Sequence, residues 1–238
     1  MNPNGYFAFC PTLLNLINQR TATGATGRHY DNLPALSTLG NLHVLRELIL
    51  EFKPRDTLEI GLAFGGSALT CLATLREIWE SQAFSHSAID PYQKSVWDNV
   101  AVKLIEKEGL EKNFTCMDGF SCYVLPDLIR QKRQYGLVYI DGSHLFEDVF
   151  LDMYFVNDLL LENGIVVFDD CLDPHVAKVI KFVKRNYNHI LSEIGLHKYG
   201  GQKPILKRMA NLFGYRQARG FMKTGNGRRE WNARFINF

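Results

Sequence analysis

The chain has 238 residues, of which 46% are hydrophobic, 22% charged and 12% aromatic. Such a composition is typical of a folded globular protein and excludes a disordered chain, a collagen and a coiled coil. No apolar run approaches the roughly 18 residues of a membrane helix. Pro11 and Asn15 interrupt the mildly apolar start before any basic residue, so no signal peptide is predicted. We therefore expect a cytoplasmic protein whose five cysteines, lacking a C-x-x-C pair, form neither a disulfide framework nor a zinc site.

The formal net charge is only +2, but it is unevenly distributed along the chain. Residues 203–238 contain nine lysines or arginines and a single acid, Glu230, whereas the rest of the chain carries a net charge of −6. A basic segment of this kind can mark an acidic partner, a phosphorylated substrate or a contact between subunits. A solvated surface is an equally good explanation, because charged runs are usually exposed.

The first predicted segment, residues 1–36, is interpreted as a lid or loop, because residues 21–27 are small and rich in glycine. A helical extension follows it. Apolar residues recur at helical spacing between Leu39 and Phe52, and Pro54 prevents this helix from continuing. We expect the helix to pack on a sheet as an additional layer.

Five short apolar runs then recur at regular intervals, at residues 57–60, 87–89, 114–117, 137–140 and 165–168. Helical periodicity follows the first, fourth and fifth run, which gives a βαβ alternation. Runs that are almost wholly apolar belong to a parallel sheet covered on both faces. The expected fold class is α/β, with a doubly wound, mostly parallel sheet over residues 37–200. The basic segment 201–238 is expected to join the same domain, with residues 231–238 as an edge strand.

Acidic residues directly follow four of the five predicted strands. They are Asp90, Asp118, Asp141 and the pair Asp169 and Asp170. Ligands of open α/β sheets bind beyond the carboxyl ends of the strands, so these residues are expected around one site. Any one of them can instead cap the next helix, but so many at one edge favour a site.

The first strand runs into the loop Leu58-Glu-Ile-Gly-Leu-Ala-Phe-Gly-Gly-Ser67, whose glycines allow a nucleotide to approach the backbone. The loop fits a dinucleotide motif and a nucleoside motif equally well, and in both Ala63 replaces the middle glycine. Asp90 is suited to accept hydrogen bonds from a ribose diol in either case. The loop therefore predicts a nucleotide or nucleoside cofactor without deciding between the two.

Five motifs, in order and spacing, make the sequence similar to a known family: residues 58–67, A-I-D-P-Y-Q at 88–93, M-D-G-F-S at 117–121, Y-I-D-G-S-H at 139–144 and V-V-F-D-D at 166–170. Over about residues 37–190 the chain resembles class I S-adenosylmethionine-dependent methyltransferases, and among them bacterial metal-dependent small-molecule O-methyltransferases. The resemblance implies a Rossmann-like fold with S-adenosylmethionine as cofactor. It implies a cofactor site of Glu59, Gly61, Gly65, Gly66 and Ser67 at the methionine and ribose end, Asp90 at the ribose hydroxyls, Asp118, Gly119 and Phe120 at the adenine, and Asp141.

The aspartates after the fourth and fifth strands, Asp141, Asp169 and Asp170, predict a metal site. Three carboxylates repel one another unless one is protonated or a cation joins them, and hard oxygen ligands suit Mg²⁺, Ca²⁺ or Mn²⁺. The O-methyltransferases that the chain resembles hold a metal at these positions, so Mg²⁺ or another divalent cation is expected. Without a metal, Asp169 and Asp170 would form a turn in which one acid caps the following helix.

His144 is the candidate catalytic base, and Asp141 is the second candidate catalytic residue. In the catechol branch of the family that the chain resembles, a lysine three residues after the first metal ligand takes the hydroxyl proton, and His144 occupies that position. A histidine accepts a proton at neutral pH, and a cation makes a bound hydroxyl more acidic. The alternative is that His144 is an N-cap or loop residue without a catalytic role.

Together these features predict methyl transfer from S-adenosylmethionine to a hydroxyl of a small molecule, a sugar or a secondary metabolite. A short-chain dehydrogenase is disfavoured, because the one Tyr-x-x-x-Lys match, Tyr199 to Lys203, contains two glycines and should not be helical. The alternatives are a nucleic-acid methyltransferase, whose Asn/Asp-Pro-Pro-aromatic motif is absent, and a non-catalytic binding protein of the same fold. Residues 1–36 and the basic segment are expected to shape the acceptor pocket or a homo-oligomer contact, and a phosphate-bearing acceptor would give the basic segment a role.

Overall fold

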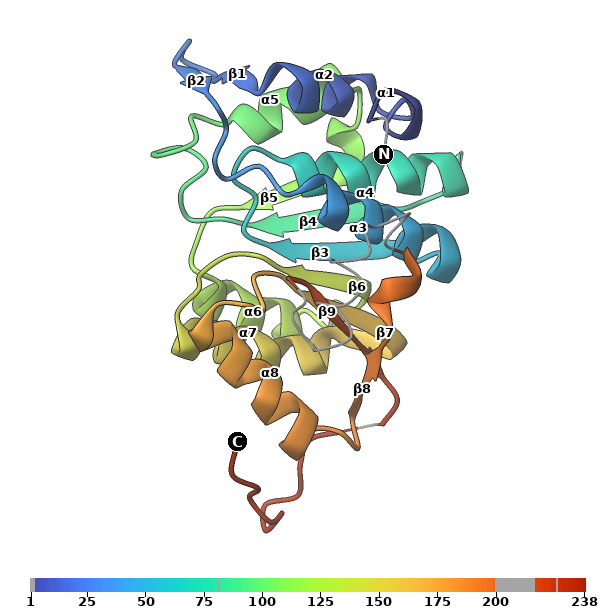
Figure 1. Ribbon diagram of the computed structural model, residues 1–238, viewed down its shortest axis with the longest axis vertical. Helices are drawn as coiled ribbons and strands as arrows, with labels where there is room; N and C mark the ends of the chain where they lie inside the picture. Colours follow the sequence, from blue (N-terminus) through green and yellow to red (C-terminus); the bar gives the residue numbers. More distant parts are fainter. Residues whose placement is uncertain (1–2, 81, 200–216, 226) are drawn as a thin grey trace.

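A seven-stranded sheet forms the centre of the molecule (Figure 1). The computed structural model describes residues 3–80, 82–199, 217–225 and 227–238. Within these residues the strand order is β5-β4-β3-β6-β7-β9-β8. The strands are β3 (Asp56–Ile60), β4 (Ser85–Ile89), β5 (Phe114–Met117), β6 (Tyr135–Ile140), β7 (Leu160–Phe168), β8 (Leu191–Ile194) and β9 (Arg219–Lys223). Strands β3 to β7 are parallel and β9 is antiparallel to both β7 and β8, which confirms the predicted doubly wound, mostly parallel sheet.

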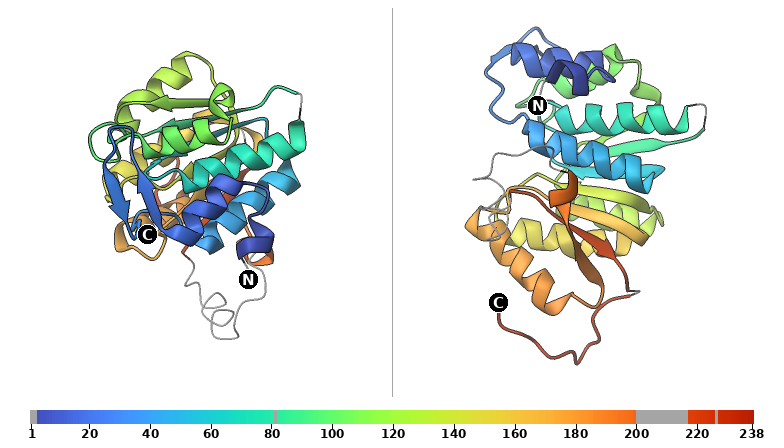
Figure 2. Two further views of the ribbon diagram at one scale, coloured as in Figure 1. Left: turned by 90° about the horizontal axis from the view of Figure 1, so that it is seen from above. Right: turned by 45° about the vertical axis from the view of Figure 1, so that its right-hand side comes forward.

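Side chains that alternate along the strands divide the apolar residues between two cores. In β6, Leu137 and Tyr139 belong to one core, and Val138 and Ile140 belong to the other. The two groups of helices that complete these cores lie on opposite sides of the sheet (Figures 1 and 2). The first group is α3 (Leu39–Phe52), α4 (Gly66–Trp79) and α5 (Val100–Lys107), and the second is α6 (Ser121–Arg130), α7 (Phe146–Leu159) and α8 (Pro174–Asn186). Burial on both faces explains why β6 and residues 165–168 of β7 are almost wholly apolar.

The N-terminal segment contains more regular structure than the sequence predicts. It forms α1 (Pro3–Tyr6), α2 (Pro11–Gln19) and a hairpin of β1 (Thr21–Thr23) and β2 (His29–Asp31). The prediction of a loop or lid is therefore wrong for the start of the glycine-rich stretch, whose later residues form the hairpin turn. Gly27 has a φ of 95° in this turn, a conformation that favours glycine. The expected helix α3 is confirmed, and it ends with Lys53 in the left-handed region directly before Pro54.

The far edge of the sheet also differs from the prediction. The strand next to β7 is β9, and not the predicted strand of residues 231–238. Strand β9 lies between β7 and β8, and residues 231–238 form no strand. Instead, the last residues run along α8. The Asn186 side chain accepts a hydrogen bond from the Ile236 N–H (2.9 Å) and donates one to its carbonyl oxygen (2.8 Å). The Phe182 and Phe238 rings pack edge to face with centroids 5.2 Å apart, so contacts with a helix hold this segment.

The described part of the basic segment is occupied by contacts within the fold. Arg219 pairs with Glu193 at 2.6 Å, and the Lys223 ammonium donates to the backbone carbonyl oxygens of Asn157 in α7 and of Leu160 at the start of β7. Arg228 pairs with Asp158 on α7, and the Arg229 guanidinium donates to the carbonyl oxygen of Arg234. Of the nine basic residues, four lie outside the described residues: Lys203, Lys207, Arg208 and Arg216.

The remaining described elements are two short 3-10 helices, η1 (Glu111–Asn113) and η2 (Leu196–Tyr199). Among the described helices, none has the length and apolar character needed to cross a membrane. All five cysteines are free thiols, as the sequence predicts.

Candidate active site

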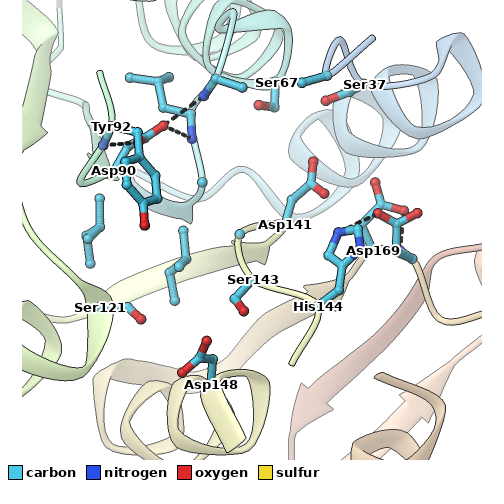
Figure 3. Close-up of a pocket in the computed structure, with 18 of the residues that line it drawn as sticks. Ser37, Ser67, Asp90, Tyr92, Ser121, Asp141, Ser143, His144, Asp148 and Asp169 are labelled. Atoms are coloured by element: carbon cyan, nitrogen blue, oxygen red, sulfur yellow. Dashed lines mark hydrogen bonds and ion pairs between the residues drawn. The ribbon is translucent and has the colours of Figure 1, made fainter. Parts of the chain in front are cut away.

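A pocket of about 860 Å³ opens at the carboxyl ends of the central strands (Figure 3). Asp90 and Tyr92 lie on one side of it, and Asp141, His144 and Asp169 lie on the other (Figure 3). The predicted site residues in its wall are Gly61, Gly66, Ser67, Asp90, Phe120, Asp141, His144, Asp169 and Asp170. The strand ends therefore meet around one cavity, as the rule for open α/β sheets requires.

The carboxylate of Asp90 holds the glycine-rich loop against the end of β4. Its Oδ2 accepts hydrogen bonds from the N–H groups of Leu62 (3.1 Å) and Ala63 (2.9 Å), and its Oδ1 accepts one from the Tyr92 N–H (2.7 Å). The side chain of Gln93 donates a further bond to Oδ2 at 3.1 Å. Asp90 is only 3% exposed, so these bonds stabilise a buried charge and fix the loop together with the carboxylate.

The loop itself depends on backbone conformations that favour glycine. Gly61 has a φ of 90°, and a Cβ placed on it would lie 2.2 Å from the carbonyl oxygen of Asp141. Gly65 has a φ of 78° and packs against Ala101 of α5. Ala63, which replaces the expected middle glycine, also adopts a positive φ of 43°. An L-residue in this region costs about 1 kcal/mol, so the loop keeps the geometry of a glycine motif under local strain.

Four residues of the predicted cofactor set do not line the pocket: Glu59, Gly65, Asp118 and Gly119. The side chain of Glu59 is fully buried in the sheet, with Oε1 3.5 Å from Nε2 of His86. Asp118 pairs with Lys94 at 2.9 Å on the surface. The sequence places Glu59 in β3 and Asp118 directly after β5, but the direction of each of these two side chains depends on packing.

Aromatic side chains form the rim beside Asp90. The rings of Tyr92 and Phe120 meet edge to face with centroids 6.0 Å apart, and about half of each side chain is exposed. Trp97 lines the same part of the pocket and packs edge to face on Phe64 at 5.0 Å. An exposed aromatic rim beside a buried carboxylate suits a ligand with a flat ring and a hydroxylated sugar.

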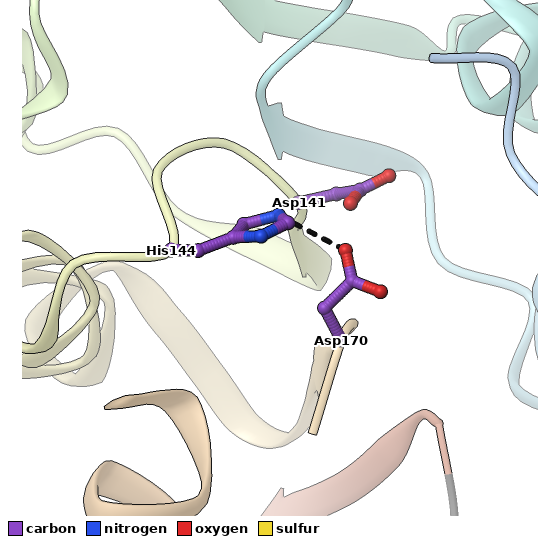
Figure 4. Close-up of side chains that lie close together, drawn as sticks. All are labelled: Asp141, His144 and Asp170. Atoms are coloured by element: carbon purple, nitrogen blue, oxygen red, sulfur yellow. Dashed lines mark ion pairs between the residues drawn. The ribbon is translucent and has the colours of Figure 1, made fainter. Parts of the chain in front are cut away.

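Asp141, His144 and Asp170 form a cluster on the opposite side of the pocket (Figure 4). One ligand atom from each lies within 4.8 Å of the other two. The Nε2 of His144 is 2.9 Å from Oδ2 of Asp170. Asp170, the second residue after β7, has a φ of 47°, in the left-handed region.

The predicted triad of carboxylates is thereby divided, because Asp169 is held from within the protein. Its Oδ2 accepts hydrogen bonds from the side-chain amide of Asn41 (2.5 Å) and from the hydroxyl of Tyr139. Its Oδ1 accepts one from the backbone N–H of Asp170 at 2.7 Å. Both oxygens thus have partners in the protein, whereas Asp141 and Asp170 each place one carboxylate oxygen in the cluster with His144.

The cluster has the electrostatic character of a cation site. Burial, reinforced by the charges of Asp169 and Asp170, raises the pKa of Asp141 well above its ordinary value. Burial also raises the pKa of Asp169, although the Tyr139 hydroxyl opposes this. Among the described residues that line the pocket there is no lysine or arginine. Carboxylate oxygens that have no lysine or arginine partner suit Mg²⁺, Ca²⁺ or Mn²⁺. The imidazole of His144 is also a suitable ligand for Mn²⁺.

The sequence motifs do not include several residues that line the pocket. Residues 34–38, which precede α3, form one wall, and Ser143, Asp148 and Gln217 form others. The motif around Asp141 could have indicated Ser143 and Asp148, because both follow the same strand end. Residues 34–36 and Gln217 belong to the two terminal segments expected to shape the acceptor pocket, but no motif marks them individually.

The fold is shared with solved methyltransferases. The chain is similar to an O-methyltransferase from Bacillus cereus in complex with SAH, with 17% identity, a TM-score of 0.63 and coverage of 89% of this chain and 88% of that one. A methyltransferase from Podospora anserina bound to SAH has 13% identity, a TM-score of 0.60 and 81% coverage of both chains. TomG from Streptomyces achromogenes, an O-methyltransferase involved in tomaymycin synthesis and solved with SAM, has 15% identity, a TM-score of 0.54 and coverage of 80% and 82%. At these identities the similarity establishes the fold, which is that of Rossmann-like O-methyltransferases.

The sequence of the chain is also similar to that of a known domain family. Residues 58–171, just under half of the chain, match a family model described as a methyltransferase domain. No curated protein sequence matches the chain. The fold and the matched domain agree with the resemblance found in the motifs: the chain has a Rossmann-like methyltransferase fold, and residues 58–171 are similar to a methyltransferase domain.

Proposed function

We propose that this chain transfers the methyl group of S-adenosylmethionine to a hydroxyl of a small molecule, with the assistance of a divalent cation. One observation carries the proposal: a single pocket joins Asp90 and its aromatic rim to the cluster of Asp141, His144 and Asp170. The first part suits the nucleoside of the cofactor, and the second suits an oxygen that must lose a proton. A sugar or a secondary metabolite is the proposed acceptor.

The cofactor is proposed to bind along the glycine-rich loop. Asp90 would accept hydrogen bonds from the ribose hydroxyls, and Tyr92 with Phe120 would contact the adenine. Gly61 and Gly66 leave room for the methionine end close to the backbone, and Ser67 offers a hydroxyl there. In this arrangement the sulfonium methyl would face the centre of the pocket.

The reaction would be an in-line displacement at the methyl carbon. The acceptor oxygen forms the new C–O bond while the C–S bond of the sulfonium breaks, leaving S-adenosylhomocysteine and a methyl ether. The hydroxyl proton would pass to the imidazole of His144, whose Nε2 is oriented by Asp170 at 2.9 Å. Orientation and deprotonation are the two contributions that such a transfer requires of the protein.

Asp141 and Asp170 are the proposed holders of the divalent cation, and Asp169 stays a predicted third ligand. A bound cation supplies Lewis-acid chemistry, which lowers the pKa of an attached hydroxyl. The donor set fits Mg²⁺ because its carboxylates converge without a lysine or arginine among the described lining residues. For Asp169 to bind the cation, one of its bonds to Asn41 or Tyr139 would have to lengthen or be shared.

The proposed acceptor does not need a phosphate. Lysine and arginine are absent from the described lining of the pocket, and Arg219 and Arg228 of the basic segment form ion pairs within the fold. A phosphate-bearing acceptor therefore stays a prediction that depends on residues 203–216. Binding of the true acceptor that does not weaken with added salt would count against it.

Calorimetric titration of the chelator-treated protein with S-adenosylhomocysteine, with and without Mg²⁺, tests the proposal. We expect the nucleoside to bind while NAD, the control, does not. A separate Mg²⁺ titration should give a heat signal that disappears in Asp141→Asn. If neither the nucleoside nor NAD binds, the chain is a non-catalytic protein of this fold instead.

A further inference from the structure

We propose that the β1–β2 hairpin positions the cofactor wall of the pocket, and that Asp98 is the positioning residue through which it does so. The wall is the segment of residues 91–99, which connects β4 to α5 and contributes Pro91, Tyr92 and Trp97 to the pocket. This inference rests on the proposed cofactor site. It concerns a hairpin that lies beside α5 at one end of the sheet (Figure 1) and has no residue in the pocket wall.

The carboxylate of Asp98 is enclosed by the hairpin turn. Its Oδ2 accepts hydrogen bonds from the N–H of Thr26 (3.0 Å) and from its hydroxyl (2.8 Å), and Oδ1 lies 3.2 Å from the same N–H. The backbone adds a bond from the Ala25 N–H to the Asp98 carbonyl oxygen at 2.7 Å. Asp98 is only 7% exposed, so this contact is a charged anchor shielded from water.

Other contacts join the hairpin to the same segment on either side of Asp98. The hydroxyl of Tyr30 donates to the carbonyl oxygen of Val96 (2.7 Å), and the Arg28 guanidinium donates to the same oxygen (3.3 Å). The ammonium of Lys103, on α5, donates to the carbonyl oxygens of Thr23 and Gly24. The hairpin is therefore bonded both to the wall segment and to the helix that follows it.

Packed aromatic rings and the strained backbone of the wall segment connect the hairpin to the pocket. Tyr30 packs edge to face on Phe64 at 5.4 Å, and Phe64 packs in the same way on Trp97 at 5.0 Å. Asp98 and Asn99 adopt positive φ angles of 45° and 52°. L-residues adopt this conformation at a cost, so the wall needs external contacts to hold it. The hairpin supplies those contacts and thereby fixes Trp97 and Tyr92 beside Asp90.

Two variants test the proposal from opposite sides of the contact. Asp98→Asn removes the charge but keeps the shape, and Gly24→Ala places a Cβ 2.2 Å from Oδ2 of Asp98, which forces the carboxylate to move. Asp31→Asn is the matched control, because it changes an exposed pair with His29 in the same hairpin. The readouts are the Kd of S-adenosylhomocysteine by calorimetry, its effect on tryptophan fluorescence and the Tm of each free protein.

We expect each test variant to raise the Kd of S-adenosylhomocysteine about tenfold, which corresponds to about 1.4 kcal/mol. The double variant should weaken binding little more than either single variant, because both act on one contact. The control should keep the wild-type Kd. A variant that lowers Tm while keeping the wild-type Kd would show that the hairpin only stabilises the fold, which overturns the proposal. A wild-type protein that binds no nucleoside would instead overturn the cofactor site itself.

Discussion

The buried carboxyl of Asp152 on α7 makes the stability of this protein depend on pH in a way that can be worked out from the structure. Asp152 is 1% exposed, and its Oδ1 has no hydrogen-bond partner among the described residues. Burial raises its pKa from 3.8 to about 7, against a hydrogen bond from Ser121 that lowers it and the charge of Asp148 that raises it. The folded protein therefore binds this proton more tightly than the unfolded chain does.

This difference in proton binding sets the direction in which the free energy of unfolding changes with pH. Below about pH 4 the carboxyl is protonated in the folded and the unfolded state, so it does not lower the free energy of unfolding. As the pH rises toward 7, the unfolded chain loses this proton first and the free energy of unfolding falls. With 1.36 kcal/mol for each pKa unit, the cost reaches about 4 kcal/mol at pH 8 but is less than half of that at pH 5. Asp152→Asn removes the charge and keeps the shape, so it should stabilise the protein by about 2 to 3 kcal/mol more at pH 8 than at pH 5.

Urea denaturation of wild type and Asp152→Asn at about pH 5 and pH 8, followed by circular dichroism, measures the two differences. Glu80→Gln changes an exposed carboxylate at the end of α4, so it serves as the control and should shift stability equally at both pH values. If the gain from Asp152→Asn is the same at both pH values to within about 0.5 kcal/mol, burial of this carboxyl does not control the pH dependence and the reasoning fails.

Three further substitutions separate the proposed roles in the pocket. Asp90→Ala should leave the fold intact but raise the Kd of S-adenosylhomocysteine by about 30-fold, because the ribose and the loop N–H groups both lose a charged acceptor. Calorimetry at constant ionic strength gives this value, and the circular dichroism spectrum gives the fold. Asp169→Ala should remove the Mg²⁺ heat and the metal dependence of turnover while leaving the nucleoside Kd nearly unchanged; a retained Mg²⁺ heat would restrict the ion to Asp141, His144 and Asp170. His144→Ala should lower turnover about 100-fold without weakening cofactor binding, measured as transfer of a labelled methyl group to the acceptor. Equal loss of nucleoside binding in all three variants would contradict this division of roles.

Local patterns in the sequence were sufficient to predict the sheet and the edge where the site lies. Strand β6 and residues 165–168 of β7 are apolar runs because both of their faces are covered, and this composition is visible without a structure. The acids after these strands meet at one edge because parallel strands end on the same side. Asp90, Asp141 and Asp170 could therefore be located in the pocket from their positions alone.

Strand assignments failed where pairing depends on distant partners. Residues 219–223 pair with β7 and β8, whereas the more aromatic residues 231–238 pack on α8. Both stretches contain apolar residues that suit a strand, and nothing local distinguishes them. Their places were decided by which surface remained uncovered once the rest of the sheet had formed.

The sequence by itself determined the class of fold, the edge of the sheet where the pocket lies and the presence of an acidic cluster, because these follow from periodicity and from strand ends. Only the tertiary structure decided which way each side chain points. Asp169 is held by Asn41, 128 residues earlier in the chain, and Asp98 is held by Thr26, 72 residues earlier. Such contacts form between segments that carry no signal of one another, since a side chain's orientation is set by the packing and hydrogen bonds of the whole fold.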